Sequence, residues 1–558
     1  MAQQMTEKQK ELAKKLINLA DAAKRQREED VEDVWEDITR YVLPRVTQVK
    51  GGKRPEPRRY GEDMYNSEGL NALRLASNGT SGYMMPRTAR WVKMEPTNKE
   101  VLNIPGVRAF FEDTTEALHG ELNRSNYYGE MTPVLDNGFS VGTSTLFIED
   151  DPDSGAVNII SVDPSEMYIS ENKYKKADTF FRRHWMTGQA MLDKFDDAID
   201  EKMTEQIKRN PFEMYEIIHA MYKREDRVFE KIDSLNKPWA SVYILVEKNQ
   251  ILRESGFDFP RYVCWRHTRI TGTPYGGSPA WDALADILRI NSHSMDLLDA
   301  SHLAVRPPMA FPQEMHELDI SPNGMNPFRL PGRVPQKLDV LGDFPFGQER
   351  EEAIRRSIRD HFQTDFFLLL TQSDRQKTAF EVSEMAGERA AVMSTVIGRI
   401  ESELIDPTLE IIYRLAALAG RMPEVPAALL ESGDEFRWEY VGPLAQLQRR
   451  HHGQRTRSEL LMQNQAILEI FPDTRDIIDG DELLRVAMHE GGMAPHVIRD
   501  KDAVQVIRQQ RAEMEAQQMQ QESELQQAQA LGGPKAPEPG SAAEGVIKGR
   551  GQATPRDL

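Results

Sequence analysis

The sequence predicts an α+β protein that is mainly helical. Apolar residues recur at three- and four-residue steps through most of the chain, which is the period of a helix. Between residues 143 and 269 the pattern changes to the short, alternating runs of strands. Near the middle, two helical segments flank a proline- and glycine-rich stretch without helical period. Helix, irregular excursion and returning helix form the central pattern of the chain.

The composition is that of a globular protein. The 558 residues are 39% hydrophobic and 28% charged, which is enough for roughly three or four core-bearing units. The formal net charge is −19. Because nucleic-acid binding depends on neutralising phosphates, this charge argues against a general, tight nucleic-acid binder. It does not exclude a protein past which DNA slides.

Cys264 is the single cysteine, so no intrachain disulfide framework is possible. We expect this thiol to be a small buried hydrophobe in a strand. The N-terminus carries charges where a signal peptide needs an apolar run, and no stretch approaches roughly 18 consecutive apolar residues. We therefore expect a soluble protein that is not secreted and not associated with a membrane.

The N-terminal region is predicted to be helical. Residues 6–43 form one or two amphipathic helices that end at Pro44, with Leu12, Leu16, Leu19 and Ala23 on one buried stripe. A basic loop follows, whose cations are Lys50, Lys53, Arg54, Arg58 and Arg59. This loop is either simply solvated or contacts DNA or an acidic neighbouring subunit.

Small residues between 65 and 96 predict a closely packed helix that ends in a loop anchored by Trp91. Helices are expected at 107–125 and 131–141, and strands from Thr143 to Arg269. The acidic turn at 150–155 lacks the spacing of an EF-hand, so it is interpreted as a hairpin turn.

The first central helix lies within Tyr275 to Met309. Ser278 and Pro279 mark its start, and Pro307 and Pro308 mark its end. The returning helix is predicted at 346–370. A long helix follows at 379–418 with a kink at Pro407, then a smaller region at 424–511 that contains a strand at 436–442. From about residue 512 the composition predicts a glutamine-rich helix and a disordered tail.

No catalytic motif was found. The chain has no Walker A sequence, no GxGxxG after a strand, no HExxH and no GxSxG. The adjacent His451 and His452 lie among arginines and are interpreted as exposed loop residues. The sequence thus predicts neither catalytic residues nor a metal site nor a cofactor.

Five stretches carry a resemblance to a known family. They are, in chain order, YNSEGLNALRLASNGTSGYMMPRTARWVKMEP; GTSTLFIEDD with VDPSEMYIS; YGGSPAWDALADILRINSHSMDLLDASHLAVRPPM; KTAFEVSEMAGERAAVMSTVIGRIESELIDPTLEII; and EYVGPLAQLQRR. In this order the chain resembles the portal, or head-to-tail connector, protein of short-tailed double-stranded DNA bacteriophages. The likeness spans residues 20 to 510. Phe380 departs from the family's TAxE motif, where a small or polar third residue is more usual.

The resemblance implies a portal fold with named regions. These are a wing of N-terminal helices and a β subdomain (1–277), a first stem helix (278–306), a clip (307–345), a second stem helix (346–370), a channel or tunnel loop (371–377), a long wing helix (378–423), a crown (424–511), and a C-terminal glutamine-rich helix with a disordered tail (512–558).

The resemblance also implies a function. Twelve subunits would form a ring at one capsid vertex of the virion, assembled in the host cytoplasm. The terminase motor would package double-stranded DNA through its channel, and DNA would later be ejected through it. Further implied partners are the major capsid and scaffolding proteins and a tail adaptor. The portal would be a structural protein, not an enzyme.

Three groups of site residues follow from these expectations. The DNA-facing channel loop would present Gln372, Ser373, Arg375, Gln376 and Lys377. The stem helices would pack through Leu284, Ile287, Leu288, Asn291, Met295, Leu298, Ile354, Ile358 and Phe362. The clip would contact an adaptor or another subunit through Pro307, Pro308, Phe311, Phe328 and Pro331. Asn291 and His302 are expected to make polar contacts between helices.

Two alternatives from other classes remain open from sequence. One is a metal-dependent hydrolase or nuclease with a dispersed acidic site, and the other is a monomeric helical adaptor. Size in solution separates these alternatives from a ring.

Overall fold

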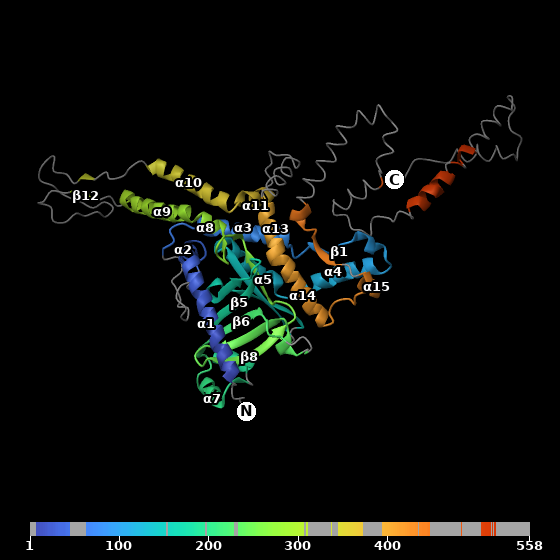
Figure 1. Cartoon of the computed structure of the whole chain (residues 1–558). Helices are drawn as coiled ribbons and strands as arrows, with labels where there is room; N and C mark the ends of the chain where they lie inside the picture. The colour runs from blue at the N-terminus through green and yellow to red at the C-terminus, as the bar shows by residue number, and fades with distance from the viewer. Residues whose placement is uncertain are drawn as a thin grey trace, which may run out of the picture. The chain divides into compact units, whose positions relative to one another are not determined.

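A computed structural model (Figure 1) gives the structure of the protein. It describes residues 7–44, 63–151, 155–195, 198–227, 231, 233–305, 309–310, 336–337, 344–371, 393–432, 435–446, 481, 504–514, 516 and 518–520. The chain divides into two compact units, Met1–Gln463 and Asn464–Leu558. In the second unit, residues 504–514 are helical, and Arg508 forms hydrogen bonds of 2.6 and 2.7 Å with both carboxylate oxygens of Asp481. The elements below belong to the first unit.

Two helices open the chain, as the sequence predicts: α1 (Glu7–Asp30) and α2 (Glu32–Tyr41). The side chains that α1 buries are Ala13, Leu16, Ala20, Ala23 and Arg27. Leu19 is 46% exposed, so its expected place on the buried stripe is wrong. Because consecutive helical residues point about 100° apart, a stripe through Leu16 and Ala20 turns Leu19 towards solvent.

Arg27 is a buried arginine that holds α1 and α2 against the β subdomain. Its guanidinium bonds Glu32 through Nε (3.0 Å) and Nη2 (2.6 Å). Nη1 donates to the carbonyl oxygens of Pro164 (2.7 Å), Ser165 (3.0 Å) and Met167 (3.1 Å). The guanidinium carbon also lies 4.1 Å from the ring centre of Tyr168. A buried charge is tolerated where partners replace its water in this way.

Five antiparallel strands form the larger sheet, in the order β4-β5-β6-β7-β8. They are β4 (Met167–Glu171), β5 (Ala177–Thr187), β6 (Met214–Lys223), β7 (Trp239–Leu245) and β8 (Gln250–Phe257). Helix α1 covers one face, where it packs on Ile218 and Val242. The short helices α6 (Gly188–Phe195) and α7 (Glu201–Arg209) pack with Ile217 and Tyr243. Since successive strand residues point to opposite faces, α6 and α7 cover the other side.

The smaller sheet has the order β3-β2-β9 and is also antiparallel. Its strands are β2 (Thr143–Asp151), β3 (Ala156–Val162) and β9 (Tyr262–Arg266). The hairpin between β2 and β3 confirms the turn predicted at 150–155. Cys264 lies in β9, as expected, but its side chain is only half-buried. Loss of water around the thiol raises its pKa to about 12.

The helices α3 (Glu68–Met84), α4 (Val107–Arg124) and α5 (Tyr127–Ser140) agree with the predicted helical segments. Between α3 and α4 lie β1 (Val92–Pro96) and the short helix η1 (Lys99–Asn103). Strand β1 pairs with β14 (Phe436–Tyr440) in the register Val92↔Tyr440. The predicted loop at the end of this helix is confirmed, since residues 85–91 are irregular and lead to Trp91, which is fully buried and stacks on Tyr440.

The pairing of β1 with β14 joins a segment near residue 92 to one near residue 440. The strand predicted at 436–442 exists, but it completes a ladder with the N-terminal region and lies within the first compact unit. The short helix α15 (Ala427–Ser432) precedes this strand.

The central segment contains α8 (Pro279–Asp282), α9 (Leu284–Val305), α10 (Phe344–His361) and α11 (Thr364–Thr371). Figure 1 shows α9 and α10 side by side, and they are in contact. Beyond them, β12 (Met309–Ala310) pairs antiparallel with β13 (Gln336–Lys337). The predicted returning helix at 346–370 is two helices, because Gln363 adopts φ 51° and ends the helical path.

The long helix predicted at 379–418 is described from residue 393. It consists of α13 (Ser394–Arg399), a π-helical turn η5 (Ile400–Ile405) and α14 (Asp406–Leu418). Directly before Pro407, where a kink is predicted, the helix widens into one π turn, and Pro407 occupies the first turn of α14. Proline has no N–H to continue the preceding ladder of helical hydrogen bonds, which explains why the irregular turn lies here.

Among the described residues, no helix has the length and apolar character that a membrane crossing needs.

Arg27→Met should destabilise the first unit, because it leaves the buried Glu32 carboxylate without its cation. We expect a loss of about 3–5 kcal/mol, the usual cost of removing one partner of a buried pair. Trp35, whose ring centre lies 5.8 Å from the guanidinium, contributes a local fluorescence signal for urea unfolding. The matched control is Arg25→Met, since Arg25 is exposed and its Nε donates to the Asp21 carbonyl at 3.3 Å. Equal midpoints for the two variants would contradict this role of Arg27.

Candidate functional site

The helical hairpin of α9 and α10 has an inner apolar face that its own chain buries. Ile287, Ile354, Ile358 and Phe362 are all at most 6% exposed, and Leu284 is partly buried against the same core. These are five of the nine residues predicted for stem packing. The sequence pattern did not single out Ala283 and Ile290, which are also buried.

A second set of the predicted packing residues faces outward. In the single chain Leu288 is 37% exposed, and Met295 and Leu298 are each 44% exposed. They follow one another at helical steps of seven and three residues along α9, so they share one side of the helix. A single returning helix covers one side of α9, and this outward face is left to solvent in the single chain.

Asn291 contacts the segment before α3 rather than α10. Its Oδ1 accepts from the backbone nitrogens of Tyr65 (2.7 Å) and Asn66 (3.2 Å), and its Nδ2 donates to the Asp63 carbonyl at 2.8 Å. His302 is exposed. The local pattern could not reveal the partner of Asn291, because more than 200 residues separate the two segments.

Other polar side chains join the two helices of the hairpin. Ser357 Oγ donates to Asp286 Oδ2 at 2.6 Å, and Ser294 Oγ lies 3.3 Å from Glu351 Oε1. Arg359 Nε bonds Glu68 of α3 at 2.7 Å. The sequence analysis missed these contacts because serine and charged residues on an exposed helix carry no distinctive spacing. They fix α10 to α9 and to the body of the protein.

The base of the hairpin passes close to the turn between α5 and β2. Gly142 has φ 84°, and a Cβ at this position would lie 2.3 Å from the Gly276 carbonyl oxygen. Gly276 N donates to Thr143 Oγ1 at 2.9 Å. Ser278 donates to the Ser140 carbonyl, and its Oγ also accepts from Trp281 N at 3.0 Å to cap α8. Only glycine fits this approach without strain.

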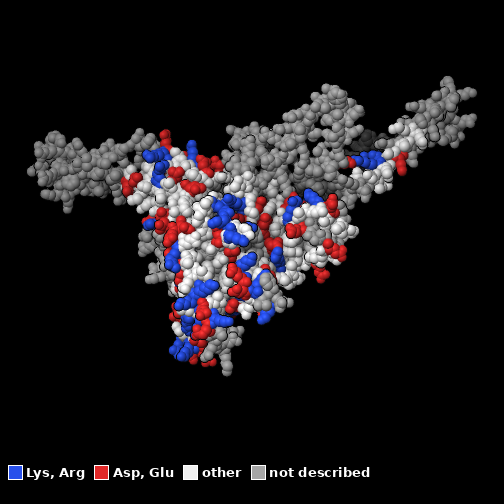
Figure 2. Space-filling view, in the orientation of Figure 1, with Lys and Arg blue, Asp and Glu red and all other residues white. Residues whose placement is uncertain are grey.

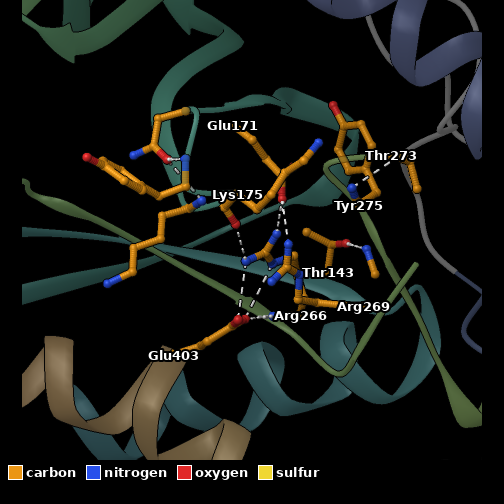
Figure 3. Close-up of polar contacts among 12 residues, drawn as sticks. Thr143, Glu171, Lys175, Arg266, Arg269, Thr273, Tyr275 and Glu403 are labelled. Carbon is orange, nitrogen blue, oxygen red and sulfur yellow. Dashed lines mark hydrogen bonds and ion pairs between the residues drawn. The ribbon is translucent and has the colours of Figure 1, made fainter. Parts of the chain in front are cut away.

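A buried arginine lies beside this base and connects three elements (Figure 3). Arg266, at the end of β9, bonds Glu171 of β4 at 2.5 Å. Its backbone nitrogen, Nε and Nη2 all bond the Glu403 carboxylate in η5, at 3.1, 3.4 and 3.2 Å. The Arg266 side chain is 5% exposed. This network ties the smaller sheet, the larger sheet and the long helix together next to the start of α8.

Burial keeps the histidines of the β subdomain neutral. It lowers the pKa of His184 to about 3, that of His267 to about 4 and that of His219 well below its usual value. His219 bonds Tyr262 OH (2.8 Å) and Ser241 Oγ (2.9 Å) and stacks on Tyr243 with centres 4.0 Å apart. The geometry is that of packing within a sheet. No group of three or more potential metal-ligating side chains occurs among the residues that the structure describes.

Two of the three predicted site groups lie outside the described residues. The channel-loop residues Gln372, Ser373, Arg375, Gln376 and Lys377 are among them, and so are the five clip residues Pro307, Pro308, Phe311, Phe328 and Pro331. Helix α11 ends at Thr371, directly before the predicted loop. Its Phe367 is 1% exposed and packs against Gly79 of α3. Figure 2 shows acidic and basic side chains intermingled over the described part of one face.

The fold and its site define a mixed helix-and-strand protein with a helical hairpin that turns an apolar face outward. Comparison with known proteins makes this class specific. The profile of the family described as "Bacteriophage head to tail connecting protein" matches residues 13–498. The chain therefore belongs to the family of bacteriophage head-to-tail connecting proteins, which confirms the resemblance found in the sequence.

Two curated relatives align with most of the chain. A "Probable portal protein" of Bordetella phage BPP-1 is 26% identical over 488 residues, 86% of this chain and 87% of the relative. The "Portal protein" of Salmonella phage epsilon15 is 23% identical over 503 residues, 86% and 88% of the two chains. A chain from the structure titled "Virion of native gene transfer agent (GTA) particle" aligns with 73% of this chain and 88% of its own, at 12% identity and a TM-score of 0.30.

The stability of the folded protein should depend on pH through Glu401, which lies in the π turn. Burial, and then the negative charge of Asp406, raise the pKa of Glu401 to about 7. The folded state therefore favours the protonated carboxyl, and this contribution is lost as pH rises from about 4.5 to 7. Glu401→Gln should make unfolding less dependent on pH in this range. The control is Glu424→Gln, which changes an exposed side chain, and identical pH profiles for wild type and Glu401→Gln would contradict the assignment.

Proposed function

We propose that this protein is a portal subunit that assembles with copies of itself into a ring around a DNA channel. The observation that carries the proposal is the outward apolar face of α9, formed by Leu288, Met295 and Leu298. The names of the two curated relatives support it. Twelve copies are the number that the family resemblance implies.

We infer that the outward face contacts a different surface of a neighbouring copy, as a ring of more than two subunits requires. Polar side chains of the hairpin already form hydrogen bonds within the chain. The three large apolar side chains of the outward face remain partly exposed in the single chain. Burying such a side chain fully is worth about 1.5–3 kcal/mol, so completing the burial of a partly exposed one adds roughly 1 kcal/mol. A contact between two different surfaces repeats around an axis and closes into a ring when the rotation fits.

The other regions take their roles from this arrangement. The α9 and α10 hairpin would form the stem, residues 307–345 the clip that receives a tail adaptor, and residues 371–377 the channel loop that faces DNA. The terminase motor would drive double-stranded DNA through the ring, and the DNA would later leave through it. The ring would occupy one vertex of the virion, with major capsid and scaffolding proteins as neighbours during assembly in the host cytoplasm.

Leu288→Asp tests the assembly face directly. A carboxylate in this position would have to be buried between copies at a cost of several kcal/mol, so we expect rings to be lost while the single chain stays folded. Electron microscopy of the purified protein measures ring formation, and far-ultraviolet circular dichroism checks the fold. Leu288→Met is the matched control because it keeps an apolar side chain of similar volume. Intact rings of Leu288→Asp would show that this face is not an interface.

Arg375→Ala with Lys377→Ala tests the channel loop. We expect rings to form normally while DNA packaging changes, because each lost phosphate contact lowers the salt dependence of DNA retention by about 0.9 in slope. The charge-preserving pair Arg375→Lys with Lys377→Arg serves as the control. Packaging equal to wild type in the alanine variant would remove the DNA-facing role from residues 371–377.

A further inference from the structure

The hairpin between β4 and β5 carries a basic, aromatic tip that the proposed channel does not use. The tip, Asn172 to Lys176, exposes Lys173, Lys175 and Lys176. Tyr174 between them is 71% exposed, although tyrosine has a large apolar ring. The amine of Lys173 lies 4.9 Å from the centre of this ring.

Hydrogen bonds hold the tip in one conformation. Asn172 Oδ1 accepts from the backbone nitrogens of Tyr174 (2.8 Å) and Lys176 (3.2 Å). The backbone of Asn172 also accepts from Lys175 N and donates to the Lys176 carbonyl, both at 2.9 Å. Lys175 takes φ 60°, the left-handed conformation that closes the turn. The cations are therefore presented from a fixed backbone, which reduces the entropy lost on binding.

The ion-pair network of Arg266 and Glu171 (Figure 3) contacts the tip through Lys175. Arg266 Nη2 donates to the Lys175 carbonyl at 3.4 Å. Glu171 pairs with Arg266 at 2.5 Å, with Lys175 at 3.6 Å and with Arg269 at 3.7 Å. The Arg269 side chain is 42% exposed. One nearly buried carboxylate thus orients three cations, two of which reach the surface.

Positive charge is in excess at this place, in contrast with the chain as a whole. The tip and its network contain five cations, Lys173, Lys175, Lys176, Arg266 and Arg269, against three carboxylates, Glu171, Asp178 and Glu403. Among the described residues, Lys173 and Lys176 form no ion pair with a carboxylate. An excess of cations beside an exposed tyrosine hydroxyl is suited to bind phosphates.

We propose that the β4–β5 tip, together with Arg269, binds the phosphate backbone of duplex DNA without sequence preference. Lysines contact phosphates as hydrated point charges, and they are depleted in the cores of interfaces between proteins. The protruding turn offers phosphate contacts and no paired side chains that could read base edges. Because the rest of the chain is acidic, the contact is weak and sensitive to salt.

This contact is separate from the proposed channel loop at 371–377. The proposal rests on the proposed function in one respect, that a portal comes into contact with duplex DNA. Ring formation is measured by microscopy and DNA binding by anisotropy, so a failure of either proposal is recognised by itself.

The test compares two triple variants of the full chain. The first is Lys173→Ala, Tyr174→Ala and Lys176→Ala, which leaves Lys175 and its network intact. The matched control removes two exposed lysines and an exposed aromatic elsewhere: Lys202→Ala, Lys208→Ala and Phe212→Ala, where Phe212 is 80% exposed. Fluorescence anisotropy with a labelled 30-base-pair duplex of random sequence measures affinity between about 50 and 200 mM NaCl, the range in which phosphate contacts are most evident.

The slope of log affinity against log salt is negative, and we expect the tip variant to reduce its magnitude by about 2. Each of the two lysines contributes roughly 0.9. The control should match wild type, and a fourth protein with Lys173→Arg and Lys176→Arg should keep the wild-type slope. A tip variant with wild-type affinity and slope would overturn the proposal, and so would a wild-type protein without measurable binding at the lowest salt. If the tip variant lost rings but bound DNA as wild type does, the proposal would be overturned. The tip would then contact an acidic surface on a neighbouring subunit.

Discussion

The close approach of the chain at Gly142 and Gly276 determines where the helical hairpin leaves the body of the protein. Only glycine permits the backbone of the α5–β2 turn to lie against the segment that begins α8. Ser278 then caps α8 while it bonds the end of α5. Beside this point, Arg266 holds β4, β9 and η5 through Glu171 and Glu403. The direction of α9 is thus set by a rigid joint rather than by the hairpin itself.

This joint explains how a narrow hairpin can serve an assembly. One face of α9 packs on α10 and the core, while Leu288, Met295 and Leu298 remain partly exposed. A hairpin held firmly at its base presents that outward face in one orientation, so a neighbouring copy meets a preorganised surface. Asn291, Ser294 and Ser357 stabilise the orientation through polar contacts within the chain.

Local patterns in the sequence were enough to find most elements but not their long-range partners. The strands β2, β3 and β5 to β7 and the helices α1 to α5 have clear periods, and the structure confirms them. Strand β14 was recognised by its alternation, yet its pairing with β1 joins positions more than 300 residues apart and has no local signal. The break at Gln363 was missed because Phe362, Phe366 and Phe367 keep a helical spacing across it. Polar contacts such as Asn291 with Asp63 depend on tertiary packing for the same reason.

The assembled state is the central claim, and the mass of the purified wild-type protein in solution tests it most directly. Multi-angle light scattering coupled to size exclusion gives this mass without a standard of known shape. The chain has a mass of 63.7 kDa, and a ring predicts a single species at a large whole multiple of this value, about twelvefold by the family resemblance. A stable monomer at micromolar concentration would contradict the claim.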